Sequence, residues 1–434
     1  MFCRLLPAAA LVVLGGCMEM DSEAIQSRLK LPFGQEQEQV SQGAGNFVQE
    51  DRSDGSEIFD TLLARRSVIP EDSTLSQVAD IALASGARAS EAELRTAKLR
   101  AEAEDKNWLP TLEPTVSLTS LGDVVTGLIV EQVLYDHGRK KAEREYAAAD
   151  VEVAAVTLSQ DMNDRVYTAQ SLFVEAVKNQ HRAALADRAL AQMNRFRKIV
   201  YGRVEGGVSD KGDLRMVDTR SSSLRTQRDT AREAAQTALS ELTAMTGTSF
   251  QIADVGKLGI SALPEVEALA VVKAKAEAGR NIARAKVERA GQLPGIGAVA
   301  SSGSAALQLV SETGLGFGTA ARIKAIESTK ETALLQVDEA REDSARARSR
   351  LQNRIESLKR QQAEAEGLAR EGQETYRLFE AQFRAGQRSV LEVVDIYEQS
   401  IQREMEGLNA KYDTLLAELQ LARDLGLLAN GEAI

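Results

Sequence analysis

Apolar side chains recur every third or fourth residue along most of this 434-residue chain, a spacing that predicts long amphipathic helices. The two clearest seams run from Leu214 to Met245 and from Val390 to Ala422, both in alternating steps of three and four. This spacing is typical of coiled coils, and small residues in the seams would let neighbouring helices approach closely. The pattern predicts helices over residues 73–107, 139–201, 213–245, 265–291, 319–383 and 390–422.

Two stretches change to a partly alternating pattern rich in β-branched and small polar residues, which is typical of strands. In the first half we expect two strands, over residues 111–121 and 124–134, on either side of a Gly-Asp turn. In the second half residues 295–317 predict a weaker hairpin of shorter strands. About ten residues is also the length that a tilted strand needs to cross a bilayer. Since a hairpin is only marginally stable alone, we expect both hairpins to join a larger sheet.

The order helix, two strands, long helix, turn, helix occurs twice, which indicates an internal duplication. A proline breaks the helical pattern before each hairpin, in "WLP" (108–110) and in "QLPG" (292–295). In each half, the two shorter helices placed end to end match the long one in length. The sequence therefore predicts a mainly α protein with a small β region, in which paired helices build a hollow cylinder.

The first 17 residues read as an export signal, with a positive charge at Arg4 and an apolar run at 5–14 that is too short for a permanent membrane span. Leu14-Gly15-Gly16-Cys17 resembles the bacterial lipobox, in which cleavage before the cysteine leaves Cys17 lipid-modified and holds the protein to outer-membrane lipid. Met18, rather than Asp, follows that cysteine, which by resemblance to sorted lipoproteins favours the outer membrane. The alternative is an ordinary signal peptide with an incidental cysteine.

These patterns divide the chain into five segments. They are a signal peptide (1–16), a polar tether or wrapping segment (17–72), a first repeat (73–250, turn at 202–212), a second repeat (251–427, turn at 384–389) and a C-terminal tail (428–434).

Composition excludes several classes of function. A net charge of −11 disfavours nucleic acid as a partner, because binding to its backbone needs concentrated positive charge. Two histidines and two cysteines do not build a usual four-ligand zinc site, and both cysteines fall within the first 17 residues. With no Ser/His/Asp set and no phosphate-binding loop in the sequence, we expect neither catalysis nor a metal or cofactor.

Over residues 70–427 the chain resembles the TolC family of outer-membrane channel proteins, specifically its lipoprotein-anchored members. The resemblance rests on the duplicated element order, on "LYDHGRKKAE" (134–143) at the first strand-to-helix junction, and on "FRAGQRSVLEVVDIYEQS" (383–400) at the second turn. The last resembles the Gly-x-x-Ser-x-Leu-acid-x-x-Asp signature of the family.

This resemblance implies a homotrimer, in which four strands per protomer close a twelve-stranded transmembrane β-barrel above a periplasmic α-helical tunnel. Closure is also favoured physically, since four isolated strands would leave two unpaired edges in lipid. The implied function is a passive duct for efflux or type I secretion, working with a periplasmic adaptor protein and an inner-membrane ABC or proton-driven pump. The alternative is a structural coiled-coil envelope lipoprotein without a pore, which would have no need for the strand pattern.

The second turn has two interpretations. Ser389 and Glu392 fit a capping box, and Gly386 would supply a positive φ, which explains all three without a function. Mapped by motif, Glu392 and Asp395 fall where the family places pore-facing acids near its periplasmic constriction. Asp213 is the first-half counterpart of Glu392. Rings of such acids would favour cations.

The resemblance also implies a lock at the closed entrance, in which an acid of the first turn meets an aromatic hydroxyl and an arginine of the second. Arg388 matches this arginine, but Phe383 stands where the tyrosine would be, so the lock would rest on Arg388 with Asp213 or Asp210. The two turns would dock the helical hairpins of the adaptor, because helix ends interlock only where side chains are short. The docking residues we expect are Gly206, Gly207, Val208, Gly386, Gln387 and Ser389.

Overall fold

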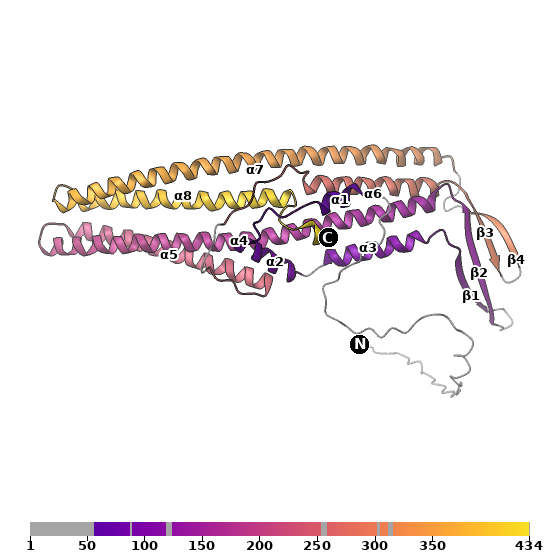
Figure 1. Cartoon of the computed structure of the whole chain (residues 1–434), viewed down its shortest axis with the longest axis horizontal. Helices are drawn as coiled ribbons and strands as arrows, with labels where there is room; N and C mark the ends of the chain where they lie inside the picture. The colour runs from indigo at the N-terminus through magenta and orange to yellow at the C-terminus, as the bar shows by residue number, and fades with distance from the viewer. Residues whose placement is uncertain are drawn as a thin grey trace, which may run out of the picture. The chain divides into compact units, whose positions relative to one another are not determined.

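The computed structural model describes residues 56–86, 89–118, 124–252, 258–301, 304–310 and 316–433. They belong to one compact unit, Gly55–Ile434, in which helices lie side by side and a small sheet stands at one end (Figure 1). The predicted architecture, mainly α with a small β region, is confirmed. The expected signal peptide, Cys17 and most of the segment 17–72 lie outside the described residues. Over the ranges given above, every helix lacks the combination of length and apolar character that crossing a membrane requires.

Six helices make up most of the unit: α3 (Ala89–Asp105), α4 (Arg139–Glu205), α5 (Lys211–Thr246), α6 (Leu269–Gly291), α7 (Thr319–Arg384) and α8 (Val390–Asp424). The long helix α4 packs against α3 and α5, which follow one another along it, and α7 packs in the same way against α6 and α8 (Figure 1). Helix α4 also contacts α6 and α8, and this joins the two halves. The predicted duplication, with one long helix matched by two shorter ones in each half, is therefore present.

The stretch 73–107, which the pattern predicts as one helix, is divided into α2 (Thr74–Ala84) and α3, so that prediction was wrong. The break has a cause far away in the sequence. Arg165 of α4 donates from Nε to the carbonyl oxygen of Ala82, 2.6 Å away, and so satisfies a carbonyl at the end of α2. A Cβ at Gly86 would lie 3.0 Å from the same Nε, so a larger residue there would require the Arg165 side chain to shift.

The described part of the predicted tether wraps onto the body of the unit. It begins with α1 (Glu57–Leu63) and continues to Val68, whose N–H donates to the carbonyl of Leu427 at 2.9 Å. The guanidinium of Arg65 is buried and donates to the carbonyl of Leu425 and to that of Glu267 (3.0 Å). Burial lowers the pKa of Arg65 to about 10, so the side chain keeps its charge at neutral pH. The C-terminal tail is docked as well, ending in the short 3₁₀ helix η1 (Gly431–Ala433).

The two hairpins form one antiparallel sheet of order β1-β2-β3-β4, and this confirms that both join a larger sheet. Its strands are β1 (Thr111–Leu118), β2 (Val124–Tyr135), β3 (Gly295–Ser301) and β4 (Ser304–Val310). The halves meet where β2 pairs with β3, with Glu131 opposite Val299. Of the span 295–317 expected for the second hairpin, β3 and β4 occupy Gly295–Ser301 and Ser304–Val310, while Gly316 and Phe317 are not in a strand.

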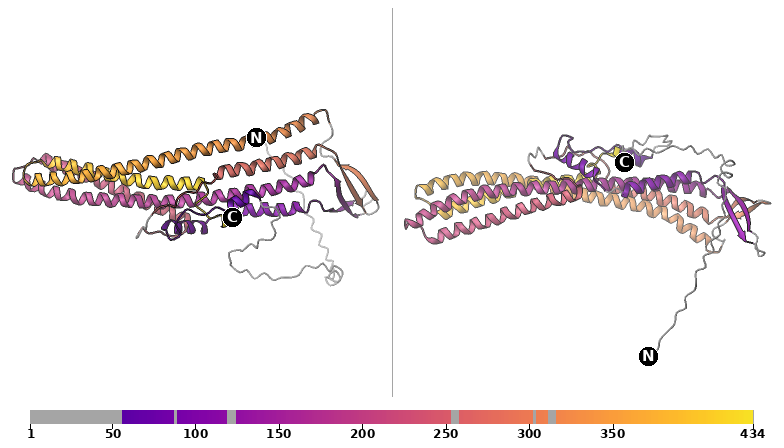
Figure 2. Two further views of the ribbon diagram at one scale, coloured as in Figure 1. Left: turned by 45° about the horizontal axis from the view of Figure 1, so that its top comes forward. Right: turned by 90° about the horizontal axis from the view of Figure 1, so that it is seen from below.

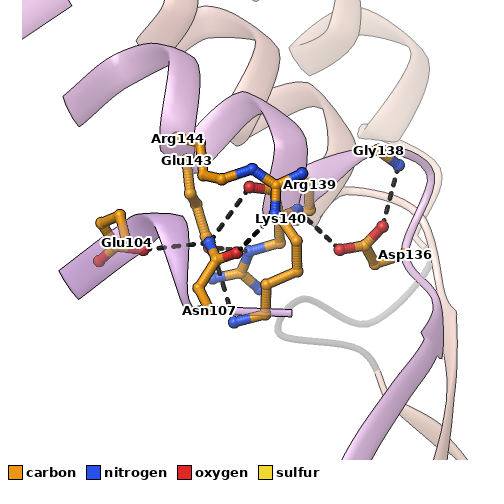
Figure 3. A network of polar contacts seen from close by, with 8 residues as sticks. All are labelled: Glu104, Asn107, Asp136, Gly138, Arg139, Lys140, Glu143 and Arg144. Carbon is orange, nitrogen blue, oxygen red and sulfur yellow. Dashed lines mark hydrogen bonds and ion pairs between the residues drawn. The ribbon is translucent and has the colours of Figure 1, made fainter. Parts of the chain in front are cut away.

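A polar network fixes the point where the sheet joins the helices (Figure 3). The carboxylate of Asp136 accepts from the N–H groups of Gly138 (3.0 Å) and Lys140 (2.7 Å) and so caps the start of α4. Asn107, just beyond α3, donates to the Lys140 carbonyl (3.1 Å) and to the Glu143 carboxylate (3.2 Å). The motif "LYDHGRKKAE" thus forms the corner that directs the hairpin away from the bundle.

Candidate functional site

Both helix–helix turns lie at the end of the unit that is opposite the sheet (Figure 2). They have the same backbone conformation, with φ of 70° at Gly207 and 76° at Gly386. In each, the next N–H donates five residues back, from Val208 to the Arg203 carbonyl (2.8 Å) and from Gln387 to the Gln382 carbonyl (2.9 Å). This is the Schellman closure that favours glycine after a helix. We term these two turns, residues 206–209 and 385–389, the tips.

The residues expected to dock an adaptor, Gly206, Gly207, Val208, Gly386, Gln387 and Ser389, are all exposed on the tips. Val208 keeps 69% of its surface exposed, although its side chain is aliphatic. A Cβ at Gly207 or Gly386 would meet nothing within 4 Å. The tips therefore offer short side chains and free space, and their role in docking stays a prediction.

Side chains cap the helix that follows each tip. The predicted capping box is present in α8: the Ser389 hydroxyl accepts from the Glu392 N–H (3.3 Å), and the Glu392 carboxylate accepts from the Ser389 N–H (3.0 Å). The Ser389 N–H and the Ser389 hydroxyl both donate to the Glu392 carboxylate (3.0 Å each), and these two bonds, together with a weaker contribution from Arg388, hold the pKa of Glu392 below its usual range. In α5 the cap is Asp210, which accepts from the Gly212 N–H at 3.3 Å.

The three acids expected at a pore constriction lie at this end of the unit, in the first two turns of α5 (Asp213) and α8 (Glu392 and Asp395). Two of them have cationic partners within the chain. Glu392 pairs with Arg388 at 3.0 Å, and Asp395 lies 3.4 Å from Arg220 of α5. No group of acids and histidines in the described residues is arranged to hold a metal ion.

Arg388 makes its contacts within its own hairpin. It reaches Glu392 and the amide oxygen of Gln382 (2.9 Å), and its guanidinium stacks 3.9 Å from the centre of the Phe379 ring. Asp210 is engaged as a cap. Among the described contacts of a single chain, none joins Arg388 to Asp210 or Asp213, so the lock between these residues stays a prediction for the assembled protein.

Several contacts that sequence patterns gave no sign of join the hairpins α4–α5 and α7–α8 toward the tips. Gln192 of α4 donates from Nε2 to the Tyr376 hydroxyl of α7 at 2.6 Å. Arg203, at the end of α4, lies 4.7 Å over the ring of Phe383, at the end of α7. Arg220 bridges to Asp395 and, at 2.8 Å, to Glu398. Phe383 is 4% exposed in a core shared by all four helices, so it contributes an apolar anchor where the family pattern would place a hydroxyl.

The sheet has two chemically different faces. Residues paired across strands share a face, and alternate residues change face. One row runs Leu112, Val130, Ala300, Ala305. This side, which we term the apolar face, includes Leu112, Pro114, Val116, Leu128, Val130, Ile296, Ala298, Ala300, Ala305, Leu307 and Leu309, joined near the helices by Gln132. The opposite face, which we term the polar face, holds both acids of the sheet. Its polar members include Thr111, Glu113, Thr115, Glu131 and Gln308, and they stand among the apolar residues Ile129, Val133, Val299, Ala306 and Val310.

The apolar face is uncovered in the single chain. Leu307 and Leu309 expose 72% and 77% of their surface, and Leu112 exposes 64%. Soluble monomers rarely leave a contiguous apolar patch of this kind exposed, so we expect this face to contact an apolar environment.

No family model matches the chain, and no curated protein does. Solved structures match over most of its length. A membrane protein from Pseudomonas aeruginosa is 16% identical with a TM-score of 0.72, covering 85% of this chain and 92% of that one. The outer membrane channel MtrE of Neisseria gonorrhoeae in its open state is 17% identical with a TM-score of 0.70 (91% and 98% covered).

The outer membrane protein VceC of Vibrio cholerae is 13% identical with a TM-score of 0.68, covering 81% of this chain and 96% of that one. At these identities the likeness establishes the fold. The chain has the fold of the outer-membrane channels, which the TolC-family resemblance predicted.

Proposed function

We propose that the protein is a passive outer-membrane channel of a tripartite efflux or type I secretion system. Three copies would pool their sheets into a twelve-stranded barrel and their helices into a periplasmic tunnel. An acylated Cys17 would add a lipid anchor. A periplasmic adaptor would dock at the tips, and an inner-membrane ABC or proton-driven pump would supply the energy, so that the channel itself catalyses nothing.

The observation that carries this proposal is the two-faced sheet. A lipid-exposed strand must alternate apolar residues outward with polar residues inward. The register supports this, because one side is almost wholly apolar over four strands and both acids, Glu113 and Glu131, lie on the other side. In the described chain β1 and β4 each have a strand on one side only. Inside hydrocarbon these free edges would leave N–H and C=O groups unsatisfied, and closing the sheet with two further copies removes them.

The helical end supports the same function. The core that joins the hairpins, with Phe196 (1% exposed) and Val393 (0% exposed) at its centre, brings both tips to one end of each copy. In a trimer, Asp213, Glu392 and Asp395 would then form rings of negative charge near the tunnel entrance. Such rings favour cations and resist anions.

Conductance in planar lipid bilayers tests the proposal. The purified, detergent-extracted protein should conduct with a preference for cations, and Glu392→Ala combined with Asp395→Ala should weaken that preference. The matched control is Asp218→Ala, which removes an acid that pairs with Arg197 within the first hairpin. Absence of conductance would favour the alternative, a coiled-coil envelope lipoprotein without a pore. Unchanged selectivity in the double variant would leave Glu392 with its capping role alone.

Docking at the tips needs a variant that leaves the fold intact. Val208→Arg is suited to this, because the side chain is exposed and its backbone φ is ordinary. We expect loss of binding to the adaptor with unchanged conductance. By contrast, a bulky residue at Gly386 would also strain a left-handed turn, so its loss of export would have two explanations.

A further inference from the structure

Three aromatic side chains are exposed where the sheet meets the helices. Trp108 (61% exposed) lies between α3 and β1, Tyr135 (55%) is the last residue of β2, and the fully exposed Phe317 lies two residues before α7. The ends of α3 and β2 and the start of α7 all lie at the end of the unit that is opposite the tips (Figure 1). Aromatic rings with a polar group favour the boundary between a membrane and water.

An irregularity in β2 places Tyr135 on the apolar face. Val133 is opposite Gly297 of β3. Two positions on, Tyr135 is opposite the neighbouring residue Ile296, so the register shifts by one here. Partners across strands share a face, and a bulge of this kind re-aims a side chain. Without the shift Tyr135 would lie on the polar face with Val133. The Tyr135 hydroxyl, 3.3 Å from Nδ1 of His137, points to the polar corner beside the helices.

Basic residues gather at the same end, at the starts of two long helices. They are Arg139, Lys140, Lys141 and Arg144 in α4, and Arg322 and Lys324 in α7. Neither helix has an acid in its first turn, whereas α5 and α8, which start at the tips, have Asp213 and Glu392 there. A positive charge at the start of a helix opposes the helix dipole, so these bases do not stabilise the helices that carry them.

Three of the six bases are exposed and have no partner among the residues that the structure describes. They are Lys141, Arg322 and Lys324. The other three are engaged, since Arg139 and Lys140 pair with Glu143 (2.9 and 3.5 Å) and Arg144 donates to the amide oxygen of Asn107 (3.1 Å).

The next acids along α4 and α7 are not available to the free bases either. Glu145 pairs with Lys286 of α6 at 2.6 Å, and Glu327 pairs with Arg289 of α6 at 3.6 Å. The positive charge of Lys141, Arg322 and Lys324 is therefore open to an anionic partner from outside the chain.

We propose that these residues form a belt that binds the phosphate groups of anionic phospholipids, a role that rests on the proposed function. The belt consists of Trp108, Tyr135, Phe317, Lys141, Arg322 and Lys324. The apolar face would contact acyl chains, and the belt begins where that face ends, at the depth where headgroups follow the chains. With a net charge of −11, the protein as a whole is repelled by an anionic surface, so binding there needs local bases of this kind.

Trp108 tests the position of the belt without a label, because it is the one tryptophan of the chain. The full-length protein is inserted into vesicles that carry a spin label either on the lipid headgroup or deep in the acyl chain. We expect stronger quenching of the Trp108 fluorescence by the headgroup label. Stronger quenching by the deep label, or none by either, would overturn the proposal. The second result is expected if another part of the protein or a second copy covers the ring.

A choice between lipids tests the chemistry of the belt. Quenching of Trp108 by brominated phosphatidylglycerol and by brominated phosphatidylcholine gives the relative affinity for the two lipids. We expect phosphatidylglycerol to be favoured by roughly fivefold, the factor for one base near an anionic surface, and the preference to shrink at high salt. Inorganic phosphate at constant ionic strength should leave the preference unchanged. Its loss would indicate a site for free anions and would overturn the proposal.

A triple variant, Lys141→Gln with Arg322→Gln and Lys324→Gln, should abolish the preference for phosphatidylglycerol. It should melt no lower than the wild type, because the lost charges oppose the helix dipoles. The matched control replaces three exposed bases that lie away from the starts of α4 and α7, by Arg225→Gln, Arg350→Gln and Arg354→Gln, and should keep the preference. Equal lipid selectivity of the two triple variants would contradict the proposal.

The two proposals fail separately. A protein that conducts in bilayers but does not distinguish the two lipids would refute the belt and leave the channel. A protein that does not conduct while Trp108 still reports a preference for phosphatidylglycerol would refute the channel and leave a lipid-binding surface.

Discussion

The division of the sheet into an apolar and a polar face predicts opposite outcomes for the same substitution at two adjacent residues. Leu128 of β2 lies on the apolar face, opposite Pro114, and is 49% exposed in the single chain. The next residue, Ile129, lies on the polar face, directly opposite Glu113. We expect Leu128→Arg to prevent stable insertion and Ile129→Arg to be tolerated.

The magnitude follows from the membrane environment. An arginine on the lipid-facing side of a barrel costs roughly 2–4 kcal/mol at the bilayer midplane. Three copies carry the change, so the assembled trimer would lose about 6–12 kcal/mol, a large part of what a membrane barrel has available. At position 129 the guanidinium would instead stand in an aqueous lumen beside a carboxylate, where a cross-strand pair of opposite charge contributes about 0.2–1 kcal/mol.

The assay is insertion into preformed liposomes on dilution from detergent, scored as the fraction of protein recovered as a protease-protected trimer. Circular dichroism before dilution would check that both variants are helical. We expect the recovered fraction to fall severalfold for Leu128→Arg alone. Equal recovery of the two variants would refute the assignment of the apolar face to lipid, since a sheet in water has no reason to distinguish them.

Two further predictions concern local structure. Gly426→Ala should lower the melting temperature clearly more than Gly247→Ala. Both glycines have positive φ, but only at Gly426 would an added Cβ clash, because it would lie 2.6 Å from the Leu269 side chain, whereas a Cβ at Gly247 would meet nothing within 4 Å. Backbone strain should destabilise each variant by about 1–2 kcal/mol, and overpacking should destabilise Gly426→Ala by roughly 1–3 kcal/mol more. Equal melting temperatures of the two variants would contradict the predicted clash at Gly426. Ser389→Ala should raise the pKa of Glu392 part of the way toward its usual value, measured by NMR titration, because it removes the hydrogen bond that the Ser389 hydroxyl donates to the Glu392 carboxylate while the backbone N–H of residue 389 stays in place. That cap is complete above the usual carboxyl pKa and is lost as pH falls through the lowered value, so the variant's first turn of α8 should lose hydrogen-exchange protection at higher pH than the wild type.

Local patterns in the sequence were sufficient for most of the fold. The seams that start at Leu214 and Val390 gave α5 and α8, because a helix of this kind is specified by residues three and four apart. The capping box of Ser389 and Glu392 was recognisable for the same reason, since both partners fall within one turn. The two tips could be matched from the sequence because Asp213 follows Gly207 by the same number of residues as Glu392 follows Gly386, and the two glycines do have the same backbone conformation.

Contacts between distant residues could not be predicted in this way. The break after α2 depends on Arg165, more than 80 residues away, whose side chain gives no local signal. Arg220 and Asp395 are 175 residues apart, and each is one charged residue among many on an exposed helix face. The packing of α4 against α8 brings them together, so this ion pair became visible in the structure alone.

The central claim is that three chains share one barrel and one tunnel, and the mass of the detergent-extracted protein tests it most directly. Size-exclusion chromatography with light scattering, corrected for bound detergent, should give three times the mass of the processed chain, which is at most 46.9 kDa. A stable particle containing a single chain would contradict the claim, because one copy leaves both sheet edges and its apolar face without a partner.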